Sequence, residues 1–82
     1  MTLYDISIIP AHFNAIRGGF RTFEVRKNDR DYKAGDVLRL RECGDGGYTG
    51  RITMAVVTYV LTSRDFPEGI MEGYAVLAIG GG

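Results

Sequence analysis

The sequence has few of the residues on which metal sites and disulfide frameworks depend. Its 82 residues include one cysteine, Cys43, one histidine, His12, and no tryptophan. A single cysteine excludes an internal disulfide, and one histidine with it does not make the cluster of soft ligands that a structural zinc site needs. We therefore expect no cofactor and no metal ion.

Long apolar runs are also missing. No stretch approaches the roughly 18 apolar residues of a membrane-spanning helix, and the N-terminus lacks a basic segment followed by a hydrophobic one. These absences predict a cytoplasmic protein without membrane contact. The composition, 45% hydrophobic and 24% charged, is that of a folded protein, and 82 residues make one domain.

The formal net charge is zero, from ten basic and ten acidic residues, which argues against a strongly basic nucleic-acid module. The charge is nevertheless unevenly spread. Residues 17–33 carry six bases and three acids, a net of +3, and the other four bases and seven acids give a net of −3. An anionic partner would be attracted to this basic segment if its side chains gather in the fold, although a solvated surface has the same pattern.

Alternation of apolar and polar residues predicts one helix and about five strands. The helix is expected over residues 10–17, and the strands over residues 4–8, 21–27, 37–42, 52–61 and 74–79. Pro10 suits a first helical turn, and Gly18 or Gly19 can end the helix. So short a helix needs docking of Phe13 and Ile16 on a sheet. The predicted fold class is α+β, most simply a small curled sheet or barrel plugged by the helix.

The strand expected at residues 21–27 carries the candidate site. Its period of two sends Phe23 and Val25 to one face and Thr22, Glu24 and Arg26 to the other. Glu24 and Arg26 can therefore share one bound group, or they can form an ion pair with each other.

Three further features define the rest of the chain. Gly35 supplies the positive φ of a tight turn, and Tyr32 is expected to anchor the preceding loop on the core. The run at residues 52–61 is apolar on both faces, so it belongs in the centre of the sheet. The terminal segment, residues 80–82, is expected to be a flexible glycine tail.

The stretch from Gly19 to Arg26 reads GFRTFEVR. It resembles the motif of the ASCH domain family, a branch of the PUA-like superfamily: glycine, any residue, lysine, two of any, glutamate, any, arginine. Arg21 replaces the lysine. Residues 27–36, 48–51 and 73–74 resemble the ASCH-related family called domain of unknown function 3850, which is common in bacteria and their phages. The resemblance implies one domain over residues 1–79, a PUA-like β-barrel in which the motif strand lines a cleft beside the helix.

The same resemblance implies RNA binding or nucleotide-related chemistry. Basic side chains would contact phosphates, Glu24 would accept from the exocyclic amine of a base, and Tyr32 or Tyr48 would stack on a ring. The candidate ligand-binding residues are Arg21, Thr22, Glu24, Arg26, Lys27, Asp29, Arg30, Tyr48 and Arg51. Because only three or four phosphate contacts are available, the expected ligand is a short RNA or a single nucleotide-like unit.

Two other functions stay open. One ASCH branch resembles small amidohydrolases that act on acylated cytidine, with a lysine at the position of Arg21 and a threonine at that of Glu24. Arginine stays protonated and is a poor base, which disfavours that mechanism, but a hydrolase with Glu24 as general base stays possible. The last alternative is a phage or bacterial accessory domain that binds another protein without catalysis. Nothing in the sequence bears on the oligomeric state.

Overall fold

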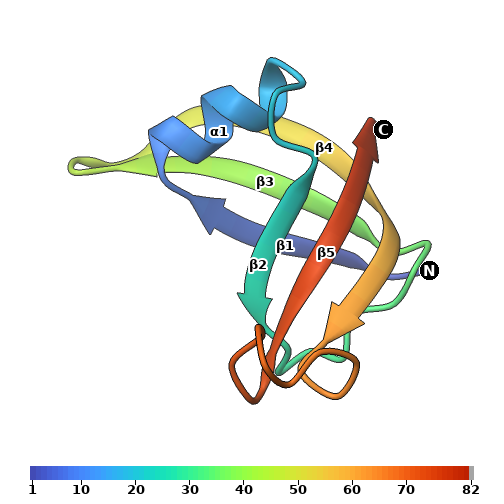
Figure 1. The fold of residues 1–82 in the computed structure, drawn as a ribbon. Helices are drawn as coiled ribbons and strands as arrows, with labels where there is room; N and C mark the ends of the chain where they lie inside the picture. The colour runs from blue at the N-terminus through green and yellow to red at the C-terminus, as the bar shows by residue number, and fades with distance from the viewer. Residues whose placement is uncertain (82) are drawn as a thin grey trace.

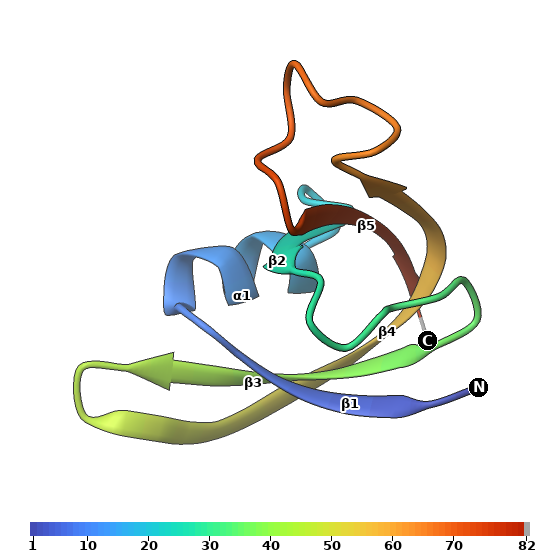
Figure 2. The same ribbon diagram turned by 90° about the horizontal axis from the view of Figure 1, so that it is seen from below.

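The computed structural model describes residues 1–81, which form one five-stranded sheet and one helix. The elements, in chain order, are β1 (Leu3–Ile8), α1 (Pro10–Arg17), β2 (Phe23–Lys27), β3 (Val37–Gly44), β4 (Gly47–Thr62) and β5 (Tyr74–Gly81). Figure 1 shows the arrangement of the strands and α1, and Figure 2, turned by 90°, shows the sheet curled into an open half-barrel with α1 at its open side. The α+β class, the early helix and the five strands of the prediction are confirmed.

The strand order in the sheet is β1-β3-β4-β5-β2. β1 runs parallel to β3, and all the other neighbouring strands are antiparallel. β4 is the longest strand, with 16 residues, and lies in the centre as its two apolar faces predicted. Its register with β5 shifts between Val57 and Tyr59. Such a bulge bends a strand, which helps β4 to follow the curl.

β5 continues to Gly81, although the sequence predicted a flexible tail from Gly80. Gly80 pairs with Val56 and Gly81 with Ala55. Ladder hydrogen bonds are made by the backbone, so glycine can take part in them without a side chain. Gly82 lies outside the described residues.

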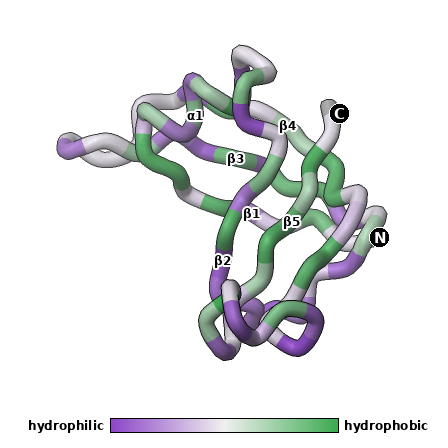
Figure 3. Tube along the Cα trace, viewed as in Figure 1, coloured by the Kyte–Doolittle hydropathy of each residue, from purple (hydrophilic) through white to green (hydrophobic). Residues whose placement is uncertain are grey.

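The core lies between the concave side of the sheet and α1. Phe13 of α1 is completely buried, and Ile16 packs partly against the same cluster, as the short helix required. The strands contribute Ile6, Ile8, Leu38, Leu40, Ala55, Val57, Ala75, Leu77 and Ile79. Figure 3 shows hydrophobic residues running the length of β5, whereas β2 alternates between hydrophobic and hydrophilic residues. No helix among the described residues is long and apolar enough to cross a membrane.

The loop between β2 and β3 is fixed by Tyr32 and Asp36. Tyr32 is only 4% exposed and its ring meets the Tyr4 ring edge-on, with 5.0 Å between centroids. The Asp36 carboxylate accepts hydrogen bonds from the backbone N–H groups of Thr2 (3.0 Å) and Lys33 (2.9 Å). Gly35 has a φ of +96°, as the turn required. Tyr32 is therefore the predicted loop anchor, and its burial raises the pKa of its hydroxyl.

β1 and β2 are the two edges of the sheet, and side chains bridge the gap between them. Arg26 Nη1 donates to the Ser7 carbonyl oxygen (3.3 Å), and Arg30 Nη1 donates to the Asp5 carbonyl oxygen (3.2 Å). These carbonyl groups belong to an edge strand, where unpaired backbone groups need another partner. Two basic residues of the segment 17–33 thus help to hold the half-barrel together.

Candidate functional site

The motif strand alternates as predicted, and its polar face is the one turned inward. On β2, Glu24 is 3% exposed and pairs in register with the buried Leu77 of β5. Phe23 and Val25 are 44% and 46% exposed on the opposite face. A buried carboxylate is costly unless charged groups or hydrogen-bond donors surround it. The neighbours of Glu24 therefore decide whether this arrangement is stable.

Two arginines enclose Glu24. Arg21 Nη1 lies 3.0 Å from Glu24 Oε1, and Arg26 Nη1 donates to Glu24 Oε2 at 3.4 Å. The Arg21 side chain is 14% exposed, and its Nη1 atom is buried without a partner in hydrogen-bond geometry. Both carboxylate oxygens face a guanidinium group inside the protein. The geometry therefore favours a positioning role for Glu24 over direct contact with a ligand.

Arg21 and Thr22 also line a pocket of about 400 Å³ at the end of α1. Gly19, whose φ is +81°, ends the helical region in a conformation that most residues disfavour. This turn directs the chain from α1 into β2 and brings Arg17 and Arg21 to the same pocket. The remaining lining residues are Ile16, Thr53, Met54, Ala55, Ile79 and Gly80. The lining residues thus include two arginines and two threonines, and no acidic residue is among them.

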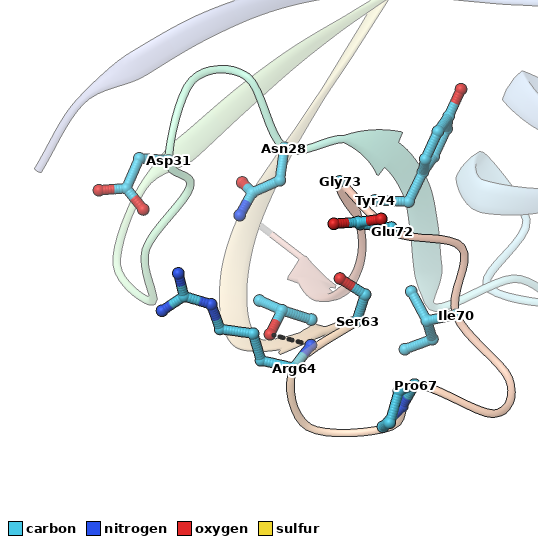
Figure 4. Close-up of a pocket in the computed structure, with 10 residues that line it drawn as sticks. Asn28, Asp31, Ser63, Arg64, Pro67, Ile70, Glu72, Gly73 and Tyr74 are labelled. Carbon is cyan, nitrogen blue, oxygen red and sulfur yellow. Dashed lines mark hydrogen bonds between the residues drawn. The ribbon is translucent and has the colours of Figure 1, made fainter.

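A larger hollow of about 900 Å³ lies between the loop after β2 and the loop that joins β4 to β5. Figure 4 shows the Arg64 side chain reaching toward Asn28 and Asp31, with Glu72 on the far side. The lining residues include one base, Arg64, and two acids, Asp31 and Glu72, and Asp31 already pairs with Lys33, so the hollow has no excess positive charge for an anion. None of the nine candidate residues from the sequence is among its lining residues.

The other candidate residues do not gather at the pocket of Arg21. Arg26 and Arg30 bridge the edges of the sheet, whereas Lys27 and Asp29 are exposed at the end of β2 and in the following loop. Tyr48 lies near the tip of the β3–β4 hairpin, which projects beyond the rest of the sheet (Figure 1). Tyr32, which the sequence offered as a second stacking residue, is unsuited to that role because its ring is buried.

Arg51 belongs to a second buried carboxylate cluster on the same hairpin. Its Nη1 atom lies 3.3 Å from Glu42 Oε2, and its guanidinium group lies over the Phe13 ring, 4.7 Å from the centroid. The Thr49 hydroxyl donates to Glu42 Oε1 at 2.7 Å. These contacts satisfy Glu42, which is 4% exposed, and they give Arg51 a structural partner.

Sequence reasoning missed two residues of these clusters. Glu42 follows Leu38 and Leu40 at intervals of two, so the alternation already placed it on the inward face of β3. Arg17 was counted in the basic segment but assigned only to the helix, and its place at the same pocket as Arg21 depends on the turn at Gly19. The described residues hold no group of three or more His, Cys, Asp or Glu side chains arranged for a metal ion.

These features define a small α+β protein, a five-stranded half-barrel with a plug helix and an arginine-rich pocket at the start of its motif strand. The chain belongs to the family described as domain of unknown function DUF3850, which matches residues 3–79. It is also 32% identical over 75 residues to the "Uncharacterized 12.9 kDa protein in GpA 3'region" of Escherichia phage P2. That match covers 92% of this chain and 65% of the phage protein. The predicted membership of the DUF3850 family and the relation to phage proteins are therefore confirmed.

Proposed function

We propose that this protein is a binding module for short single-stranded RNA or a nucleotide-like ligand. The observation that carries the proposal is a pocket lined by Arg17, Arg21 and Thr22, with no acidic residue in its lining. Guanidinium groups bind phosphate oxygens in bidentate geometry, and a threonine hydroxyl supplies a further donor. A volume of about 400 Å³ is within the usual range for small-ligand sites. Met54 and Ile79 provide an apolar wall for a ring.

Glu24 contributes indirectly, by holding Arg21 in place before a ligand arrives. The 3.0 Å ion pair with Glu24 restricts a long side chain that would otherwise lose conformational freedom on binding. The cluster of Arg21, Arg26 and Glu24 keeps one excess positive charge. Arg21 is thus oriented by a buried carboxylate while the cluster stays attractive to a phosphate.

The assignment to the ASCH branch of the PUA-like superfamily is part of this proposal. It is supported by the GFRTFEVR segment, by the position of that segment between α1 and the edge of the sheet, and by the small curled sheet itself. The zero net charge favours a short ligand over a long duplex, because few phosphates can be neutralised.

A hydrolase is less well supported by the geometry. Glu24 is enclosed by Arg21 and Arg26, and the lining of the arginine pocket includes no histidine, carboxylate or cysteine that would act as a general base. A role as an accessory domain that binds another protein is the remaining alternative if the binding experiment below gives no signal.

The substitutions Arg17→Gln and Thr22→Val test the pocket directly. Both residues are exposed, so neither substitution is expected to change stability much. Losing a hydrogen bond to a charged phosphate costs about 1.5–3 kcal/mol, so Arg17→Gln should weaken binding of a short labelled RNA by roughly tenfold or more. In the Arg17→Gln protein, the slope of the logarithm of RNA affinity against the logarithm of salt concentration should become shallower by about one unit. Fluorescence anisotropy at several salt concentrations measures both quantities.

Arg64→Gln is the matched control, because it removes a cation from the larger hollow. It should leave RNA affinity unchanged. The proposal is wrong if the unsubstituted protein binds no RNA or nucleotide in low salt, or if Arg64→Gln weakens binding as much as Arg17→Gln does.

A further inference from the structure

The outer face of three neighbouring strands, β2, β5 and β4, is apolar and uncovered. In register across the sheet, Phe23 lies beside Ala78, which lies beside Tyr59. The next row consists of Val25, Val76 and Leu61. We call these six residues the outer platform. Its aromatic residues are well exposed, Phe23 by 44% and Tyr59 by 63%.

The bulge in β4 turns Tyr59 outward. Val57 is buried and pairs with Ile79, so a regular strand would also point the residue two positions later into the core. The extra residue between Val57 and Tyr59 reverses the direction of the Tyr59 side chain. Next to this bulge, the Thr58 hydroxyl donates a hydrogen bond to the Ala78 carbonyl oxygen at 3.2 Å. An aromatic residue is thereby displayed to solvent at the point where the strand bends.

The platform has a cation at each end of its β2 edge. The Arg21 guanidinium group lies over the Phe23 ring, 4.8 Å from its centroid, and Lys27 is exposed at the other end of β2. Glu24 is the one acid in β2 and is buried on the opposite face, and residues 58–62 and 74–81 contain no acid. Cations therefore lie at both ends of β2, and the platform itself carries no negative charge.

We propose that the outer platform binds single-stranded nucleic acid by stacking bases on Phe23 and Tyr59, with phosphates near Arg21 and Lys27. Exposed aromatic rings on a sheet, flanked by cations, are suited to flat bases joined by an anionic backbone. One strand separates the two ring-bearing positions, so they lie about 10 Å apart and can hold separate bases. Ala78 leaves room between the rings. This inference rests on the proposed function, because Arg21 belongs to both the pocket and the platform.

The chain contains no tryptophan, so Tyr59→Trp introduces a single reporter at the platform. Oligonucleotides of about eight nucleotides, RNA and DNA of the same sequence, should quench its emission by stacking, whereas inorganic phosphate should not. Quenching by either oligonucleotide supports the platform, and comparison of the two shows whether the 2′-hydroxyl contributes.

The substitutions Phe23→Leu and Tyr59→Leu remove the rings but retain apolar side chains. Each should weaken oligonucleotide binding by roughly fivefold to a hundredfold and leave the affinity for a nucleoside monophosphate unchanged. Phe66→Leu is the control, since Phe66 is also exposed, by 48%, but lies in the loop between β4 and β5. It should leave both affinities as they are.

Three results would contradict the proposal that the outer platform binds nucleic acid. In the first, both Leu variants bind oligonucleotide as the unsubstituted protein does while Arg17→Gln is impaired, which leaves the pocket as the site. In the second, no nucleic acid or nucleotide binds at all, and the proposed function fails as well. In the third, light scattering shows a dimer that Tyr59→Glu dissociates while oligonucleotide binding is unaffected, so that a second copy of the chain covers this face.

Discussion

The substitution Phe13→Ala is expected to lower the free energy of unfolding by about 3–5 kcal/mol, the usual loss for a fully buried phenylalanine. Phe13 is completely buried in the core cluster. α1 has eight residues and no side-chain hydrogen bond at its N-cap, so it depends on docking to stay helical. The substitution also removes the ring beneath Arg51. An 82-residue domain has a net stability of only several kcal/mol, so much of the protein should unfold.

Urea denaturation followed by circular dichroism measures this loss. His12→Ala is the matched control, since His12 precedes Phe13 on the same helix and is exposed. Its effect should stay within about 0.5 kcal/mol. A loss of less than about 1 kcal/mol for Phe13→Ala would show that the half-barrel does not need the helix as its plug.

The substitution Glu24→Gln is expected to lower the free energy of unfolding by about 2–4 kcal/mol. It keeps the size of the side chain but removes the negative charge between Arg21 and Arg26. The Arg21 guanidinium group, largely buried, then lacks a counter-ion, and it also repels Arg26. The Arg26 side chain is 34% exposed, so water relieves part of that cost.

A thermal melt measures this effect, and a drop of roughly 10–20 °C is expected for a domain of this size. Asp31→Asn is the control, because it neutralises an acid in an exposed ion pair, with 2.8 Å between Asp31 Oδ2 and Lys33 Nζ. It should leave the melting temperature unchanged. A Glu24→Gln protein that melts no earlier and yet binds no nucleotide would make Glu24 a ligand-contacting residue and contradict its positioning role.

The elements could be predicted from the sequence because each has a clear local pattern. The helix began at Pro10 and ended before a left-handed glycine, as expected. The strand at residues 52–61 lies in the centre of the sheet, as predicted, although Ile52, Met54 and Tyr59 on it are exposed. The buried anchor at Tyr32 was also predicted.

The face that β2 turns inward could not be predicted in the same way. Alternation places Phe23 and Val25 on one face of the strand and Glu24 and Arg26 on the other, but it does not determine which face is buried. Burial of Glu24 depends on Arg21, which reaches it only because of the turn after α1, and on the place of β2 at the edge of the sheet. Such non-local contacts leave no periodic signal.

The candidate site was likewise predicted only in part. Arg21 and Thr22 do lie together at a pocket, because they are adjacent to the same turn. Tyr48 and Arg51 were grouped with them, but the hairpin carries these residues to another part of the sheet, where Arg51 binds Glu42. The direction of a hairpin is set by the twist and bend of its strands, which a linear motif does not record.

Binding of a nucleotide at the arginine pocket can be followed by titrating the isotope-labelled protein with a nucleoside monophosphate and recording proton–nitrogen correlation spectra. The largest shifts are expected at the backbone amides of Gly19, Arg21 and Thr22 and at the Arg17 side-chain Nε, with little change at Asn28 and Glu72. No shifts in low salt, or the largest shifts at the larger hollow or at Tyr48, would contradict binding at the arginine pocket.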